Sequence, residues 1–133
     1  MCGVVGIIST HKPVAGELYD SLIHLQHRGQ DAAGIMTYNE RFHIKKGTGL
    51  IRDIFDEHNM VRLQGKVGIG HTRYPTVGGF SIEEAQPVLT NVPYGIAMAH
   101  NGNLVNYAEL AQEVEKKDRR HVNSSVDIEV ILH

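Results

Sequence analysis

Apolar residues along the chain follow both of the periods that mark secondary structure. Residues 4–8 (Val-Val-Gly-Ile-Ile) form a short apolar run, which predicts a buried strand near the N-terminus. Leu18, Leu22 and Leu25 recur at i, i+4 and i+7, which predicts a helix over about 15–27. Further strands are predicted over 32–38, 42–46, 66–71 and 95–100, and a short helix is predicted over 50–57.

Two more helices are predicted in the last third of the chain. One starts at Asn106 and has an apolar stripe made of Tyr107, Leu110, Ala111 and Val114. The other starts with Ser124 and Asp127, ahead of the apolar residues of 128–132. This last pattern stops at His133 after barely two turns, so we expect the chain to be a fragment that is truncated at its C-terminus.

The order of these elements indicates the fold class. Strands outnumber helices and the two kinds are mixed, so we expect an α+β fold with helices packed on a sheet. The chain has 133 residues, which suits one domain. A chain of this size buries roughly two-thirds of the surface of its unfolded state, so it can build a real core.

Composition removes several classes of function. Hydrophobic residues make up 41% and charged residues 21%, as in a soluble globular protein. The net charge of −2 argues against nucleic acid as a partner. There is no apolar run long enough to span a membrane and no secretory signal, so a cytoplasmic location is expected. One cysteine cannot form an internal disulfide, a four-thiolate zinc site or an iron–sulfur cluster.

The single cysteine, Cys2, is the first candidate for chemistry. If Met1 is removed, Cys2 becomes the N-terminal residue and its own α-amino group lies beside the sulfur. An α-amino group ordinarily titrates close to neutral pH, so it can take the thiol proton directly or through a water. The alternative is that Cys2 is a small buried residue at the start of a strand.

Polar clusters follow two of the predicted strands. Asn101 and Gly102 offer an amide side chain and an accessible backbone N–H to an oxyanion, although Asn-Gly is also a common hairpin turn. Arg73 can hold a carboxylate through two hydrogen bonds, although a lone arginine is more often part of a surface ion pair. Asp127 suits a substrate ammonium group, although Ser124-x-x-Asp127 is also a common helix cap.

The nine histidines raise the question of a metal site. His24 and His27 lie three residues apart on a predicted helix, but no third ligand has a recognised spacing. We therefore predict no metal site and expect most histidines to pack or to form hydrogen bonds. The charge run over 115–120 is expected to be a solvated helix face.

Six segments taken together are more specific than any of them alone, and in order they resemble a class II glutamine amidotransferase. The segments are Met-Cys-Gly-Val-Val-Gly-Ile at 1–7, Leu-Gln-His-Arg-Gly-Gln-Asp-Ala-Ala-Gly-Ile at 25–35, Gly-His-Thr-Arg-Tyr-Pro-Thr at 70–76, Glu-Ala-Gln-Pro at 84–87, Ala-His-Asn-Gly-Asn-Leu at 99–104 and Asn-Ser-Ser-Val-Asp-Ile-Glu at 123–129. The resemblance covers essentially the whole chain. The segments at 26–31 and 73–76 favour the purine-pathway branch over relatives such as glucosamine-6-phosphate synthase.

The resemblance implies a fold and a catalytic group. The fold is that of the N-terminal nucleophile hydrolases, an αββα four-layer sandwich with two antiparallel sheets between helical layers. Cys2 would be the catalytic nucleophile that forms a glutamyl thioester. Asn101 and Gly102 would donate hydrogen bonds to the oxyanion.

The resemblance also implies how glutamine is bound. Arg73 and Thr76 would bind the α-carboxylate, and Asp127 with Gly102 would hold the α-amino group. The segment around Asp127 departs mildly from the family's usual Ser-Asp-Ser-Glu, although Asp127 and Glu129 keep their places. Two more residues, Arg28 and Tyr74, match family positions near the nucleophile that tie the state of the glutaminase to the state of the synthase, and they are expected to have a supporting role.

The function implied is hydrolysis of glutamine to glutamate and ammonia by an incomplete glutaminase domain over 1–133. In the full-length enzyme, a glycosyltransferase, the ammonia would attack C1 of phosphoribosyl pyrophosphate and give 5-phosphoribosylamine, the first step of purine synthesis. One alternative is a class II amidotransferase with another acceptor, such as glucosamine-6-phosphate synthase. The other is a catalytically silent fragment in which Met1 blocks Cys2.

The expected partners follow from this reading. Glutamine is the partner of this chain, and no cofactor, nucleic acid or membrane is expected here. Phosphoribosyl pyrophosphate and Mg²⁺ would bind only through a phosphoribosyltransferase domain that is absent from this chain. The full-length enzyme is expected to form a homo-oligomer.

Overall fold

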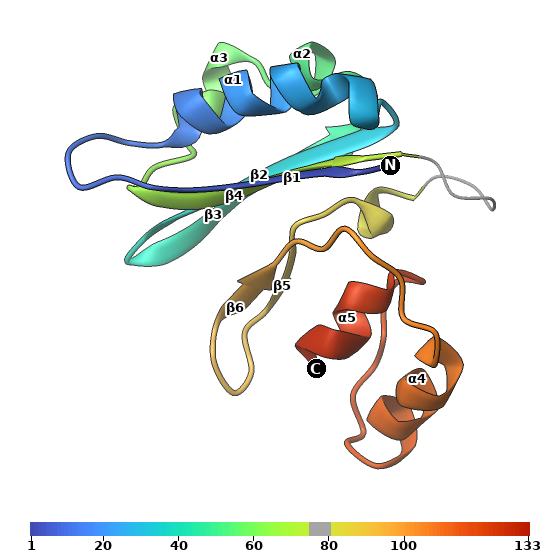
Figure 1. Ribbon diagram of the computed structural model, residues 1–133. Coiled ribbons are helices and arrows are strands. Elements are labelled where there is room, and N and C mark those ends of the chain that lie inside the picture. Colours follow the sequence, from blue (N-terminus) through green and yellow to red (C-terminus); the bar gives the residue numbers. More distant parts are fainter. Residues whose placement is uncertain (75–80) are drawn as a thin grey trace.

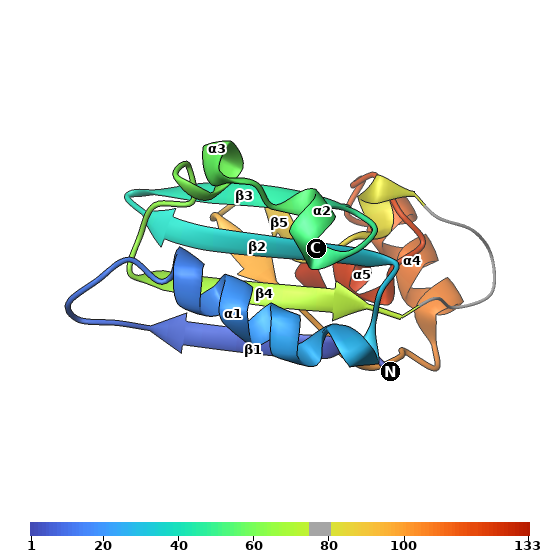
Figure 2. The same cartoon turned by 90° about the horizontal axis from the view of Figure 1, so that it is seen from above.

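A four-stranded antiparallel sheet forms the centre of the protein, whose computed structural model describes residues 1–74 and 81–133. Its strands lie in the order β1 (Gly3–Ile8), β4 (Val67–Arg73), β2 (Ala32–Asn39) and β3 (Arg41–Thr48). Every neighbouring pair is antiparallel. Because β1 begins where β4 ends, the N-terminus and the C-terminal end of β4 lie at the same end of the sheet, measured along the strands (Figure 2).

Three helices cover one face of this sheet (Figure 1). They are α1 (Ala15–Leu25), α2 (Ile51–Ile54) and α3 (Glu57–Met60), and a 3₁₀ turn over Gln26–Arg28 follows α1. The leucine stripe predicted from the sequence is confirmed, because Leu18 and Leu22 are completely buried in the core under α1.

The single helix predicted over 50–57 is wrong, because two short helices occupy this region. The α2 helix ends at Ile54, and α3 starts after Asp56. The Asp56 side chain accepts the backbone N–H of Asn59, and the Asn59 side chain accepts the N–H of Asp56. This reciprocal cap favours a new helix start over a continuous helix.

A second, smaller layer faces the other side of the central sheet (Figure 1). It consists of the antiparallel pair β5 (Val88–Thr90) and β6 (Ile96–Met98), with α4 (Tyr107–Lys116) and α5 (Asp127–Leu132). Val88, Val126, Ile128 and Leu132 form its core, with Met98 packed against them. The order of layers is helix, sheet, sheet, helix, which confirms the expected αββα sandwich of class α+β.

Some features of this second layer differ from the sequence prediction. The strand β5 was not predicted, because it has three residues directly after Pro87 and shows no alternation. The strand predicted over 95–100 is shorter and ends at Met98. None of the helices in the described part of the chain is long and apolar enough to cross a membrane.

Candidate active site

A cavity of about 240 Å³ lies where the two sheets meet, beside the N-terminus. Its wall combines residues from both ends of the chain. They are Cys2, Arg73, Tyr74, Gln86, His100, Gly102, Asn103, Tyr107, Ser125, Val126 and Asp127. The cavity therefore brings together most of the residues that the sequence singled out.

Cys2 precedes β1 and is held through its backbone. Its carbonyl oxygen accepts hydrogen bonds from Nε of Arg28 at 3.0 Å and from Nδ2 of Asn101 at 2.9 Å. The next peptide N–H, that of Gly3, donates to Oγ1 of the buried Thr72 on β4 at 3.2 Å. Cys2 is partly buried and lines the cavity.

The loop after β6 is fixed at His100, whose backbone N–H and carbonyl oxygen both form hydrogen bonds. Its N–H donates to Oε1 of the buried Gln86 at 2.7 Å, and its carbonyl oxygen accepts from Nε2 of His71 at 3.2 Å. The next two residues, Asn101 and Gly102, do not form a hairpin turn, because β6 ends at Met98 and a helix follows at Tyr107. A Cβ atom on Gly102 would lie 2.2 Å from Nε2 of His100, so the imidazole ring of His100 packs directly over this glycine.

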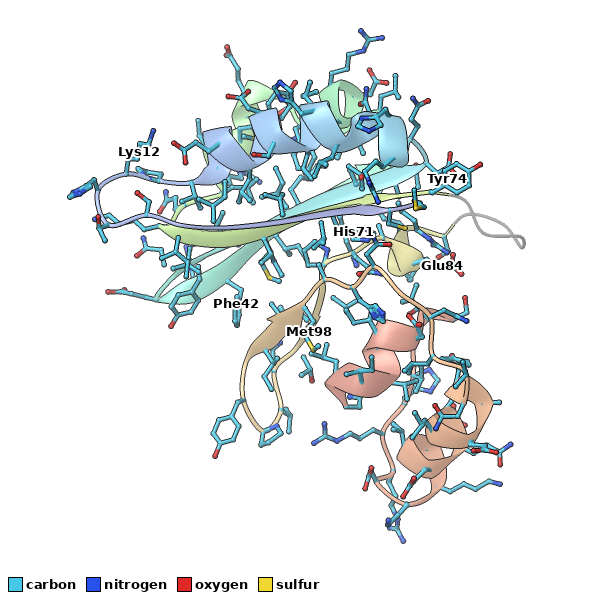
Figure 3. All side chains as sticks on the ribbon, viewed as in Figure 1. Lys12, Phe42, His71, Tyr74, Glu84 and Met98 are labelled. Atoms are coloured by element: carbon cyan, nitrogen blue, oxygen red, sulfur yellow. The ribbon has the colours of Figure 1, made fainter. Side chains whose placement is uncertain are left out.

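His71 is a completely buried polar residue on β4 that points toward the second layer (Figure 3). Burial lowers the pKa of its imidazole to about 4. The hydrogen bond to the His100 carbonyl oxygen opposes this shift, and the positive charge of Arg73 adds to it. The ring is therefore neutral at pH 7. Because its Nε2 faces a carbonyl oxygen, we assign the proton to Nε2, and the ring donates to His100.

Arg73, at the end of β4, forms an ion pair through Nη1 with Oε2 of Glu84. The two side chains are only 13% and 16% exposed, so this is not the surface pair that the sequence left open. The other oxygen of Glu84, Oε1, accepts the hydroxyl of Ser125. The hydrogen bond from Ser125 and the pairing with Arg73 hold the pKa of Glu84 below its usual value.

Asp127 is the first residue of α5, and its Oδ2 accepts the backbone N–H of Leu104 at 2.7 Å. The helix cap that Ser124 and Asp127 could have formed is absent, because the helix is preceded by Val126 without a side-chain cap. The carboxylate of Asp127 instead faces the cavity and ties α5 to the loop that contains Asn101.

The remaining candidates have different surroundings. Arg28 contacts the backbone of Cys2. Tyr74 is half exposed and is one of the residues that line the cavity. Thr76 lies outside the described residues. Nδ1 of His24 and of His27 each bonds a backbone carbonyl oxygen of the preceding helical turn, at 2.7 and 2.8 Å.

Sequence reasoning missed several residues of the site. They are Glu84, Gln86, His71, His100, Tyr107 and Ser125. The available signal was that all of these except Tyr107 lie in the resembling segments 70–76, 84–87, 99–104 and 123–129. Their roles depend on contacts between residues that are far apart in the chain, which the sequence alone does not show.

Comparison with known proteins gives consistent matches. A glutamine amidotransferase domain family matches residues 52–133. Curated relatives named amidophosphoribosyltransferase, from Pasteurella multocida and Pseudomonas aeruginosa, are 52% and 54% identical to this chain. Both alignments cover all of this chain, but only 27% and 26% of the relatives. The chain thus spans about a quarter of the length of these relatives.

Two solved structures also match the whole chain. One is described as the allosteric regulatory enzyme of purine biosynthesis, with a TM-score of 0.88, 38% identity and 29% of that chain covered. The other is the Bacillus subtilis glutamine phosphoribosylpyrophosphate amidotransferase complexed with ADP and GMP, with a TM-score of 0.87, 37% identity and 28% covered.

The buried neutral His71 predicts a pH dependence of stability. Its folded pKa of about 4 lies below the ordinary value of 6.5, so the unfolded chain binds the proton more tightly. Stability is then lost as pH falls from 6.5 toward 4, by about 2 kcal/mol between pH 7.5 and 5. Urea unfolding over this range should show that loss in the wild type and a smaller loss in His71→Gln.

The wild type and His71→Gln share all other histidines, so the difference between their losses of stability with pH reports on His71. The lowered pKa values of Glu84 and Glu129 act mainly below pH 4.5, outside this window. Equal slopes for the two proteins would show that His71 is not held neutral.

Proposed function

Because the chain belongs to the glutamine amidotransferase domain family, we propose that its cavity binds glutamine and that Cys2 hydrolyses the side-chain amide to glutamate and ammonia. One observation carries this proposal: the only thiol of the chain lies in the same cavity as an arginine and an aspartate. A free amino acid carries a carboxylate and an ammonium group. Arg73 and Asp127 have the complementary charges.

Recognition of the α-substituents uses charge-assisted hydrogen bonds. Arg73 binds the α-carboxylate, for which the planar guanidinium is well suited. Asp127 accepts hydrogen bonds from the α-ammonium group, and the backbone of Gly102 also contacts this group. We keep Thr76 as an additional carboxylate ligand, as the resemblance implies.

The chemical step starts from a processed N-terminus. Met1 precedes Cys2 and is 78% exposed, so a peptidase can reach it. Its removal leaves an α-amino group on Cys2 that takes the thiol proton. The thiolate attacks the amide carbon of the glutamine side chain and forms a tetrahedral intermediate. This intermediate collapses to the thioester: its C–N bond breaks, and the α-ammonium group of Cys2 gives the proton to the departing nitrogen, which leaves as ammonia. Water then hydrolyses the thioester to glutamate and regenerates the thiol.

The negative charge of the tetrahedral intermediate needs hydrogen-bond donors. Nδ2 of Asn101 already lies beside the nucleophile, at 2.9 Å from the Cys2 carbonyl oxygen. Gly102 follows in the same loop and lines the cavity, and its backbone N–H is the second donor in our proposal. Arg28 and Tyr74 support the nucleophile, Arg28 through its hydrogen bond to the Cys2 carbonyl oxygen.

The longer protein uses the ammonia, in our proposal, to convert phosphoribosyl pyrophosphate into 5-phosphoribosylamine for purine synthesis. The names of the relatives support this acceptor, and they give no support to the alternative of glucosamine-6-phosphate synthase. Residues 1–133 are then most of a glutaminase domain. A phosphoribosyltransferase domain outside this segment binds Mg²⁺ and phosphoribosyl pyrophosphate, and the whole protein forms a homo-oligomer in the cytoplasm.

A diazoketone analogue of L-glutamine tests the proposed nucleophile. We expect time-dependent labelling of Cys2 alone, with loss of glutaminase activity, located by peptide mapping and intact mass. Intact mass also shows whether Met1 has been removed. Labelling at another residue, full activity in Cys2→Ala, or equal labelling by the D-enantiomer would contradict the proposal.

Asn101→Ala tests the oxyanion role. Loss of one such donor typically lowers kcat by about 10²–10³. We expect that loss with little change in KM for glutamine, because the donor acts on the transition state. Asn91→Ala, in the exposed loop between β5 and β6, is the matched control and should keep wild-type kinetics. A normal kcat with a raised KM in Asn101→Ala would show that Asn101 only positions the substrate.

A further inference from the structure

The segment Glu84-Ala85-Gln86 lies between the two sheets and is fixed from both. Nζ of Lys46 on β3 donates to the carbonyl oxygen of Ala85 at 2.7 Å. A Cβ atom on Gly34 of β2 would lie 2.2 Å from the carbonyl oxygen of Gln86, so the strand approaches this segment closely where it has a glycine. These contacts hold the backbone of the segment against the central sheet.

The same segment also contacts the second layer. Oε1 of Gln86 accepts the N–H of His100, the residue before the proposed oxyanion donor Asn101. Gln86 is only 7% exposed, so this hydrogen bond is shielded from water. The segment therefore spans the boundary between the layers beside the cavity.

Glu84 adds a side-chain link across that boundary. One carboxylate oxygen pairs with Arg73 at the end of β4, and the other accepts the hydroxyl of Ser125. Ser125 lies two residues before Asp127 in the segment that leads into α5. The Glu84 carboxylate thus connects Arg73, the proposed partner of the glutamine α-carboxylate, to the segment that contains Asp127, the proposed partner of the α-ammonium group.

We propose that Glu84 is a positioning residue for glutamine recognition, which holds Arg73 and the segment of Ser125–Asp127 at a fixed separation across the cavity. The proposal rests on the proposed function. A long arginine side chain loses much rotamer freedom when it binds a carboxylate, and a fixed ion pair removes part of that loss beforehand. A guanidinium has five N–H donors, so it can serve Glu84 and a substrate carboxylate together.

A competing role for Glu84 has the opposite consequence. If its carboxylate occupied the place of the substrate carboxylate, removing its charge would strengthen glutamine binding. If Glu84 only stabilised the fold, its loss would affect every reaction of Cys2 alike. The direction and the selectivity of the effect therefore separate the three roles.

The experiment measures alkylation of Cys2 in the full-length protein by two reagents. One is the diazoketone analogue of L-glutamine, which carries the α-carboxylate and α-amino groups. The other is iodoacetamide, which carries neither. In Glu84→Gln we expect the half-saturating concentration of the glutamine analogue to rise about tenfold or more, the scale of a lost charge-assisted hydrogen bond. The maximal labelling rate and the iodoacetamide rate should stay within about threefold, because the oxyanion loop and the thiol are untouched.

Two further variants complete the test. Glu83→Gln removes the neighbouring exposed carboxylate and should behave as the wild type. Ser125→Ala removes only one of the two contacts of Glu84 and should raise the half-saturating concentration by a smaller factor, about threefold. This variant also serves if Glu84→Gln does not fold.

The possible failures are distinct. An unchanged or lower half-saturating concentration in Glu84→Gln, or an equal loss with iodoacetamide, would overturn the positioning role. An unchanged value in Ser125→Ala would overturn the link to α5. If the wild type itself did not distinguish the L-analogue from its D-enantiomer, the proposed function would fail instead.

Discussion

The antiparallel pairing of β1 with β4 brings Cys2 close to Arg73. Gly3 lies opposite Thr72 in the antiparallel register, so Cys2 emerges beside the end of the strand that leads to Arg73. The hydrogen bond from the Gly3 N–H to Thr72 fixes this register at its last position. A slip of one residue would turn every side chain of β1 to the other face of the sheet. Cys2 and Arg73 would then no longer line the same cavity.

The second layer completes the site through polar contacts. His71, Gln86 and Glu84 each bridge from the central sheet or the segment beside it to the loops around β6 and α5. Buried polar groups of this kind are costly unless they are paired, so their pairing favours one arrangement of the two layers. The neutral state of His71 belongs to the same arrangement, because a neutral ring avoids a buried charge close to Arg73.

The sequence predicted the elements whose signal is local. The leucine stripe at Leu18 and Leu22 gave α1, and the strand patterns over 32–38 and 42–46 gave the hairpin of β2 and β3. In the turn of this hairpin, Glu40 has a φ of 59°. The sequence did not predict the break in the helix over 50–57, because the cap between Asp56 and Asn59 interrupts an otherwise helical pattern.

The candidate site divides in the same way. Cys2, Arg73 and Asp127 stood out because of their positions: Cys2 follows Met1, Arg73 follows a predicted strand, and Asp127 lies at a predicted helix start. Each also carries a reactive or charged group. Gln86 also lines the cavity and Glu84 contacts two of its lining residues, but their partners are 11 to 41 residues away in the chain. Contacts of that range depend on the assembled layers, so residue type and spacing did not reveal them.

The central claim is that one cavity holds glutamine with its amide at Cys2 and its two charged groups on Arg73 and Asp127. A crystal structure of the protein after reaction with the L-glutamine diazoketone tests it directly. The account predicts a bond from Sγ of Cys2 to the analogue, with the carbonyl oxygen about 2.7–3.1 Å from Nδ2 of Asn101 or the N–H of Gly102. It also predicts the α-carboxylate on Arg73 and the α-ammonium group on Asp127. An adduct whose charged groups point out of the cavity, away from both residues, would contradict the account.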